Sequence, residues 1–284
     1  MTRKNAVAVD NLSFLFEGAE ELSLRNISFE IEEGTFVSII GHNGAGKSTL
    51  CHALVGLIPH YFVGDMGGSV VVKDRNTVDS SVTELSEVAS LVFQNPYNQL
   101  TYTAETVAEE LAFGLTTRGV SRAEMLQRVH DVAIQMRIEN LLDRNPLELS
   151  GGQIQRVAFG SAYILMPEIL ILDEATTQLD PMGADEIVSI AKKLNASGKT
   201  VIMVDNDLER VSRLADRVLV LNQGSLIADG TPRRIFAEYD QSELGLDTLD
   251  YVAISRGLNE LTGDGQMLAT TEEEATAQVK KALR

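Results

Sequence analysis

The stretch Gly41-His42-Asn43-Gly44-Ala45-Gly46-Lys47-Ser48-Thr49 lies between an apolar run, 36–40, and a segment with leucines at helical spacing. A strand, a glycine-rich turn and a helix form the context in which G-x-x-x-x-G-K-[ST] predicts a phosphate-binding P-loop. The glycines let successive backbone N–H groups point at phosphate oxygens, and the helix directs its positive end at the same anion. We expect Lys47 to reach the terminal phosphates and Ser48 to bind Mg²⁺. The alternative is a glycine turn before an ordinary helix.

Composition limits the kind of protein. The chain has 284 residues, 44% of them hydrophobic, which is enough for one large domain or one and a half. A single cysteine, Cys51, suggests a reducing compartment and a buried structural role. The net charge of −17 argues against DNA or RNA as the main partner, since nucleic-acid binders need cations against phosphate. Residues 1–9 are too short and polar for a signal peptide, and no stretch approaches the roughly 20 apolar residues of a membrane span.

Apolar runs and helical spacing alternate along most of the chain, which predicts a largely parallel sheet covered on both faces. Between 103 and 165 the spacing is helical throughout, and Ser121-x-x-Glu124 suggests a capping box there. Strands are expected at 6–9, 12–16, 27–32, 36–40, 69–72, 89–93, 169–174 and 200–204, with a hairpin at 218–224 and a loop at 59–68. Helices are expected at 107–115, 125–136, 187–194, 208–214 and 251–261, and 270–274 opens a last helix.

Two acids close the strand predicted at 169–174. Asp173 is placed to hold Mg²⁺, through water, and Glu174 to polarise the attacking water as a general base. Adjacent acids at a strand end can also be plain surface charge. With a P-loop upstream, the functional interpretation is favoured.

Ser150-Gly151-Gly152-Gln153 precedes a predicted helix and offers a second cradle of backbone N–H groups for an anion, although Ser-Gly-Gly can also be only a helix cap. Ser150 lies 23 positions before Asp173 (173 − 150). In this order and spacing the chain resembles the ATP-binding cassette (ABC) family, whose signature is LSGGQ followed by Q-R-x-x-x-A. Gly160 stands where alanine is usual.

The resemblance implies an α/β fold, a P-loop NTPase cassette with a RecA-like core, a helical subdomain and a small C-terminal dimerisation domain. It implies ATP and Mg²⁺ as ligands. It implies that Gln94 reaches Mg²⁺ and the attacking water, that Asp180 belongs to the D-loop, and that Phe16 stacks on adenine. A core position is the alternative for Phe16.

One position departs from the family. A histidine is usual after the strand that follows the acidic pair, and here the matching triplet is Asp205-Asn206-Asp207. All four histidines, His42, His52, His60 and His130, lie upstream of the acidic pair. Asn206 still donates a hydrogen bond through its amide, but it is shorter than histidine and cannot become cationic. This puts hydrolysis at the site containing this P-loop in question.

Further details resemble the ATPases of energy-coupling factor (ECF) transporters. They are the sequence of the P-loop, the segment 92–100, and a tail with Leu244-Gly245-Leu246, a Gly263-Asp264-Gly265 turn and a Thr-x-Glu-Glu helix start. That family pairs two ATPases with a transmembrane T subunit and a vitamin- or metal-binding S subunit, on the inner face of the cell membrane. The resemblance implies a T-subunit groove near Tyr97–Leu100 and four regions: 1–93 and 166–235 for the core, 94–165 for the helical part and 236–284 for dimerisation.

Three functions compete. A transport motor is favoured, paired with a second ATPase that retains a histidine. A soluble ABC ATPase of translation or DNA repair is the second, but the chain carries one cassette, and Lys47 and Leu149 are 102 positions apart (149 − 47), as in transporter cassettes. A binding-only subunit that keeps ATP without turnover is the third, and Asn206 supports it.

Overall fold

A six-stranded sheet forms the centre of the molecule. The computed structural model describes residues 4–239, 248–263, 265 and 268–283. The strand order is β10-β9-β3-β8-β7-β6, in which β9, β3, β8, β7 and β6 are parallel and β10 pairs antiparallel to β9 as the predicted hairpin. The strands are β3 (Phe36–Ile40), β6 (Ala89–Val92), β7 (Ile169–Asp173), β8 (Thr200–Val204), β9 (Arg217–Asn222) and β10 (Ser225–Gly230). These match the predicted runs closely.

Alternate residues of the central sheet enter two different cores, as expected of a sheet covered on both faces. Ile171 and Ile202 pack toward α1 (Lys47–Leu54), whereas Leu172 and Met203 pack toward α6 (Gly151–Tyr163) and α7 (Pro181–Ala196). The prediction of a largely parallel, doubly covered sheet is confirmed.

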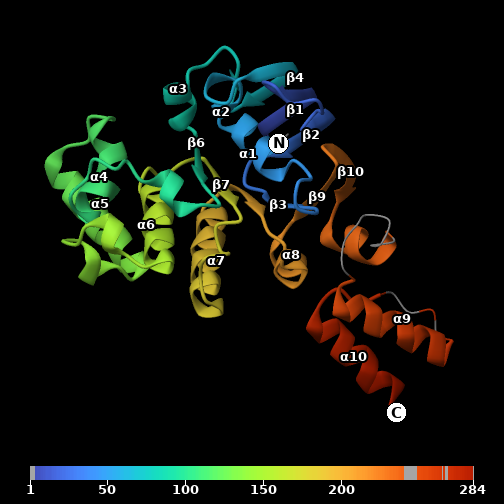
Figure 1. Cartoon of the computed structure of the whole chain (residues 1–284). Helices are drawn as coiled ribbons and strands as arrows, with labels where there is room; N and C mark the ends of the chain where they lie inside the picture. Colours follow the sequence, from blue (N-terminus) through green and yellow to red (C-terminus); the bar gives the residue numbers. More distant parts are fainter. Residues whose placement is uncertain (1–3, 240–247, 264, 266–267, 284) are drawn as a thin grey trace.

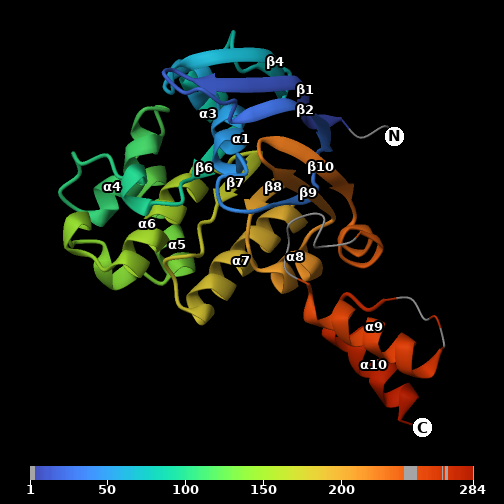
Figure 2. The same ribbon diagram turned by 45° about the vertical axis from the view of Figure 1, so that its right-hand side comes forward.

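A second, antiparallel sheet lies above α1 in Figures 1 and 2, with the order β2-β1-β4-β5. Its strands are β1 (Asn5–Phe16), β2 (Leu24–Glu32), β4 (Gly64–Val72) and β5 (Arg75–Asn76), and α2 (Leu57–His60) precedes β4. Two expectations were wrong here. The runs 6–9 and 12–16 form one strand with an irregular register between Val9 and Leu12.

The segment 59–68, expected to be a loop, contains the end of α2 and the start of β4. Two of its glycines, Gly64 and Gly68, allow close strand pairing rather than turns. A Cβ at Gly68 would lie 2.4 Å from the carbonyl oxygens of Asp10 and Asn11 in the irregular part of β1. Glycine therefore marks a close backbone approach at this position.

The helical part contains α4 (Val107–Thr116), α5 (Arg122–Met136) and α6, at the left of Figure 1. Shorter turns surround them: α3 (Val82–Ser86), η1 (Pro96–Gln99), η2 (Glu139–Leu141) and η3 (Pro146–Glu148). Residues 103–165 contain no strand, as predicted. The Ser121 hydroxyl accepts from the Glu124 N–H, but the Glu124 side chain pairs with Arg128, so the reciprocal half of the predicted capping box is missing.

Gly160 is explained by helix packing. A Cβ at this position of α6 would lie 3.0 Å from Leu111 Cδ2 of α4 and 3.2 Å from Val132 Cγ1 of α5. The glycine therefore lets three helices of the helical part approach closely.

The chain ends in a hairpin of two helices, α9 (Asp250–Thr262) and α10 (Glu272–Ala282), which projects from the lower right of Figure 1. Leu249 and Val252 join a buried cluster with Val211 of α8 (Leu208–Leu214) and with β9. A short π-helical turn, η4 (Arg234–Glu238), leads toward the hairpin. Leu244-Gly245-Leu246 and Asp264 lie outside the described residues.

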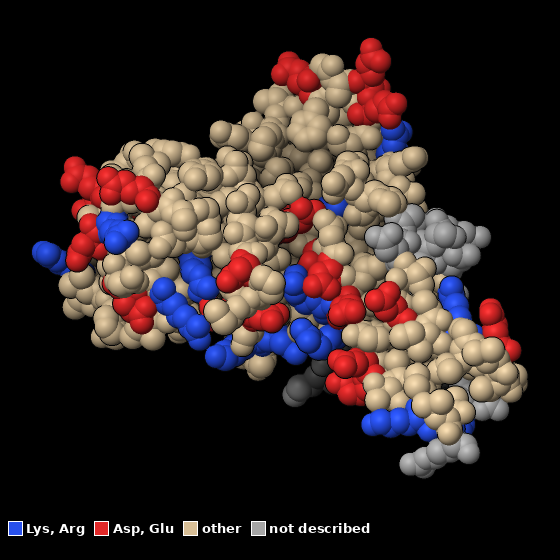
Figure 3. All heavy atoms as spheres, turned by 60° about the horizontal axis from the view of Figure 1, so that its bottom comes forward, with Lys and Arg blue, Asp and Glu red and all other residues tan. Residues whose placement is uncertain are grey.

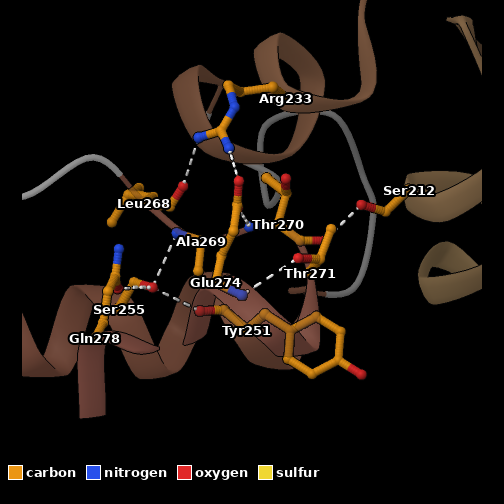
Figure 4. Close-up of polar contacts among 10 residues, drawn as sticks. All are labelled: Ser212, Arg233, Tyr251, Ser255, Leu268, Ala269, Thr270, Thr271, Glu274 and Gln278. Carbon is orange, nitrogen blue, oxygen red and sulfur yellow. Dashed lines mark hydrogen bonds and ion pairs between the residues drawn. The ribbon is translucent and has the colours of Figure 1, made fainter. Parts of the chain in front are cut away.

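Polar contacts fix the hairpin to the cassette (Figure 4). Ser212 Oγ of α8 donates to the carbonyl oxygen of Thr270 at 2.6 Å. Arg233 donates to the carbonyl oxygen of Leu268 at 3.1 Å and forms an ion pair with Glu274. The hairpin is thus attached to α8 by both apolar and polar contacts. None of the helices among the described residues combines the length and apolar character needed to cross a membrane.

Candidate nucleotide-binding site

The P-loop opens onto a cleft of about 1260 Å³. The cleft unites four predicted features: the P-loop, Gln94, Glu174 and Asn206. Gln94 follows β6, Glu174 follows β7 and Asn206 follows β8, which are neighbouring parallel strands. The carboxyl ends of such strands meet at one edge of the sheet, so Gln94 and Asn206, 112 positions apart in sequence (206 − 94), line one cleft.

Lys47 lies buried at the start of α1, where Gly46 takes a left-handed φ of 96°. Its Nζ donates to the carbonyl oxygens of Gly41 at 2.7 Å and His42 at 3.1 Å, and lies 3.6 Å from Glu174 Oε1. The ammonium therefore stands between the loop that would hold phosphates and the proposed base.

Both carboxylate oxygens of Glu174 receive side-chain amide donors. Gln94 Nε2 donates to Oε2 at 2.7 Å, and Asn206 Nδ2 donates to Oε1 at 3.1 Å. Glu174 itself has a positive φ of 47°, just beyond the end of β7. The two amides and Lys47 fix the carboxylate at the cleft. Asn206 thus makes the amide hydrogen bond that its side chain was expected to be able to donate.

Asp173 lies behind Glu174 and is buried. Burial raises its pKa to about 6, the nearby charge of Glu174 adds to the rise, and a hydrogen bond with Ser48 opposes it. Its Oδ1 is buried without a hydrogen-bond partner. An unpartnered carboxylate oxygen beside a hydroxyl fits a hard cation such as Mg²⁺, which is commonly held by one or two carboxylates and completed by substrate phosphates and water.

The described residues contain no cluster of three or more His, Cys, Asp or Glu side chains suited to a metal ion. In the structure the Gln94 amide nitrogen is directed at Glu174. The predicted role of Gln94 at Mg²⁺ stays a prediction.

The signature residues lie elsewhere. Ser150 caps α6 in a reciprocal capping box with Gln153, and a Cβ at Gly151 would lie 3.3 Å from Gln178 Oε1. Asp180 caps α7, where its Oδ1 accepts from the Gly183 N–H at 2.9 Å. None of the signature residues 150–153 lines the P-loop cleft. The predicted second anion cradle lies apart from this cleft, and its role stays a prediction.

Phe16 packs against other aromatic rings. It lies edge-on to Phe14 at 4.8 Å and to Phe62 at 6.4 Å between ring centroids, and it is not among the residues that line the cleft. Its predicted stacking on adenine stays a prediction. Cys51 is fully buried, which raises its thiol pKa and agrees with a structural role.

The second wall of the cleft was missed. It comes from the β1–β2 connection and the β9–β10 turn, and its residues are Glu21, Leu22, Ser23, Arg25, Asn222, Gln223, Gly224, Ser225 and Ile227. Gly224 N donates to the Ala45 carbonyl at 3.1 Å, and Arg25 N donates to the Gly224 carbonyl at 2.7 Å. The turn residues were visible in the sequence as a hairpin, but nothing local linked them to the P-loop.

A P-loop beside a strand-end acid, within a doubly covered parallel sheet, defines a nucleoside-triphosphate-binding cassette. The family described as ABC transporter matches residues 24–177. A putative ABC transporter ATP-binding protein of Pyrococcus abyssi is 37% identical over 282 residues, 99% of this chain and 100% of that protein. The energy-coupling factor transporter ATP-binding protein EcfA1 of Bacillus licheniformis is 39% identical over 250 residues, 87% of this chain and 86% of that protein.

Solved structures agree. The cbiO1 protein of Clostridium perfringens, described as part of the ABC transporter complex cbiONQ, matches with a TM-score of 0.70 and 30% identity, over 91% of this chain and 96% of that one. The MJ0796 cassette, a dimer bound to ADP and Pi, matches with a TM-score of 0.71 and 29% identity, over 80% and 98%. The chain belongs to the ABC transporter family and is an ATP-binding subunit of it. The predicted resemblance to ECF ATPases is confirmed.

Proposed function

We propose that this chain is an ATPase motor of an ECF-type importer and couples ATP hydrolysis to uptake of a vitamin or metal ion. The observation that carries the proposal is the placement of Glu174 between Gln94, Asn206 and Lys47 at the P-loop cleft. When bound, Mg²⁺ would neutralise the phosphate charge. Glu174 would orient water and accept its proton, and Gln94 and Asn206 would hold the carboxylate in place.

A groove beside the segment that carries Gln94 supports docking of the T subunit. It has a volume of about 260 Å³ and lies between the β6 segment, α3 and α6, with mainly apolar lining that includes Leu91, Phe93, Leu165 and Gln99. Within the predicted segment 97–100, Tyr97 is exposed and Leu100 is buried in the core. We infer that an apolar helix of the T subunit enters this groove and that Gln99 lines it.

The separation of signature and P-loop supports pairing with a second ABC ATPase. A site whose signature lies away from its own cleft is completed by another cassette. The Asn206 substitution favours a hetero-pair over a homodimer, with a partner that retains histidine. The partner's P-loop, closed by the signature of this chain, would then be the faster site.

The terminal hairpin supports a dimerisation region at 236–284. An apolar groove of about 290 Å³ on its surface is lined by Tyr251, Ile254, Ala275 and Val279, among others. We propose that the partner ATPase contacts this face. The remaining regions, 1–93, 94–165 and 166–235, follow the cassette division. The complex would sit on the inner face of the cell membrane, with the S subunit contacted indirectly.

Surface charge supports protein partners over nucleic acid. On the face shown in Figure 3, Lys and Arg side chains are interspersed with Asp and Glu. The net charge of −17 of the whole chain opposes binding to phosphate backbones.

The test is co-purification. We expect the chain to leave membranes in complex with a second ATPase and two integral membrane proteins, and the S subunit then identifies the substrate. ATP hydrolysis is compared for the chain alone, the ATPase pair and the full complex, and the full complex should be fastest. Recovery of the chain free of membrane proteins, or bound to ribosomes or DNA, would contradict the proposal.

Asn206 favours one alternative, a subunit that binds ATP without turning it over. A complex whose partner ATPase has lost its own catalytic glutamate distinguishes a hydrolysing subunit from a binding-only one. Residual hydrolysis in that complex comes from the P-loop of this chain. Its absence supports the binding-only alternative.

A further inference from the structure

Arg210 connects the two acids that flank Asn206. Its Nη1 lies 2.8 Å from Asp205 Oδ2, and its Nη2 lies 3.0 Å from Asp207 Oδ2. The Arg210 backbone N–H donates to Asp207 Oδ1 at 3.0 Å, because Asp207 caps α8. The Arg210 side chain is 14% exposed and the Asp205 side chain 6%, so their ion pair is largely shielded from water.

The same guanidinium reaches the segment after the base. Arg210 Nη1 lies 3.4 Å from Thr176 Oγ1, and Thr176 follows Glu174 by two positions. The Asp207 N–H closes the turn by donating to Asp205 Oδ1 at 3.0 Å. Asn206 is therefore held on both sides, and its amide is left directed at Glu174.

Without Arg210 this arrangement would not persist. Burial raises the pKa of Asp205, while the Asp207 N–H and Arg210 oppose the rise. Removing the cation would leave a buried carboxylate without its counter-charge, next to a second acid. Such a group must gain a proton or turn toward water. Either change would move the backbone that carries Asn206.

We propose that Arg210 is a positioning residue that holds the Asn206 amide against the Glu174 carboxylate, and so sets the orientation of the base. The proposal rests on the proposed function, since Glu174 acts as a base only there. Lysine cannot replace the arginine fully, because a point charge does not span two carboxylates as a planar fork does.

The first experiment measures hydrogen exchange of the purified chain without nucleotide. Arg210→Gln is compared with Arg213→Gln, which removes an exposed arginine from the same helix. We expect backbone amides at 204–208 and 174–177 to exchange about tenfold faster in Arg210→Gln. Arg213→Gln should match the wild-type chain. Equal exchange in the two variants would overturn the proposal, whatever the chain hydrolyses.

The second experiment measures turnover at this site alone, in a complex whose partner ATPase has lost its catalytic glutamate. Arg210→Gln should lower kcat about ten- to hundredfold, as expected for a misplaced catalytic group, with little change in ATP affinity. The kcat of Arg210→Lys should lie between those of the wild-type complex and Arg210→Gln. In an Asn206→Ala background, Arg210→Gln should cause no further loss of kcat.

A merely structural Arg210 would lower kcat by the same factor in both backgrounds, and that result would refute the positioning role. If the wild-type complex shows no turnover at this site, hydrolysis there fails as a function. The exchange comparison then decides the role of Arg210 by itself.

Discussion

At the scale of single residues, the cleft is organised around one carboxylate. Glu174 receives one amide from the strand on either side of β7, and Lys47 approaches the oxygen that Asn206 also contacts. Unlike the usual histidine, the asparagine here cannot become cationic, but it donates a hydrogen bond to the proposed base. The departure therefore changes the electrostatics of the site more than its connectivity.

Removal of the Lys47 charge should weaken ATP binding. Lys47→Ala loses a charge-assisted hydrogen bond to phosphate, generally about 1.5–3 kcal/mol, so we expect an affinity loss of about 10- to 100-fold. Calorimetry with ATP measures the loss, circular dichroism checks that the fold persists, and Lys192→Ala, an exposed lysine on α7, is the control. Equal affinity of both variants would refute the P-loop assignment.

Neutralising the base should separate binding from chemistry. Glu174→Gln keeps the size of the side chain and leaves Ser48 and Asp173 in place, so ATP and Mg²⁺ should still bind. A very poor base should reduce hydrolysis about 10²- to 10⁴-fold. Turnover is measured in the transport-competent complex. An unchanged rate would mean that Glu174 is not the base or that this site does not hydrolyse ATP.

At the scale of elements, local patterns located the strands and helices that bury contiguous apolar residues. The P-loop strand, the strand that ends in Asp173 and the hairpin expected at 218–224 were predictable because their signals lie within about ten residues. Helix α7 begins six residues earlier than the apolar spacing indicated, at Pro181 after its cap Asp180. Long-range approaches were not predictable, such as β4 beside the irregular part of β1 or the β9–β10 turn beside the P-loop.

The surroundings of two helical glycines predict how their substitution changes the stability of the chain. Gly160→Val should destabilise the chain by about 1–3 kcal/mol, because overpacking against Leu111 and Val132 forces the helices apart. Gly257→Ala in α9, where nothing lies within 4 Å of the new Cβ, should stabilise by about 0.5–1 kcal/mol. Urea unfolding of both variants measures the difference. A neutral Gly160→Val would show that α4 and α5 adapt without cost.

At the scale of the whole molecule, the signature residues 150–153 lie apart from the P-loop cleft. In the proposed hetero-pair the two features would therefore belong to different composite sites, and each could be damaged alone.

The proposed hetero-pair, with Asn206 at one site, predicts that its two ATP sites turn over at different rates. Gly151→Trp should abolish most transport, because it would obstruct the cradle that we propose closes the partner's faster site. Asn206→His should raise turnover or leave it nearly unchanged. Gly67→Trp, a bulky residue placed in open space, is the control. Turnover and uptake are measured in the same reconstituted complex. A harmless Gly151→Trp together with an Asn206 change that stops transport would reverse the assignment of fast and slow sites.

The attachment of the terminal hairpin has a thermodynamic consequence. Helix α8 spans seven residues, about 10 Å at the usual rise. It begins next to Asn206, and Ser212 near its other end bonds the hairpin. A short helix moves as one body, so a displacement at the Asn206 end would also displace the end that contacts the hairpin. Linkage of binding affinities is reciprocal. If nucleotide changes the affinity of the proposed partner for the α9–α10 hairpin by some factor, the partner changes the affinity of the cleft for nucleotide by the same factor.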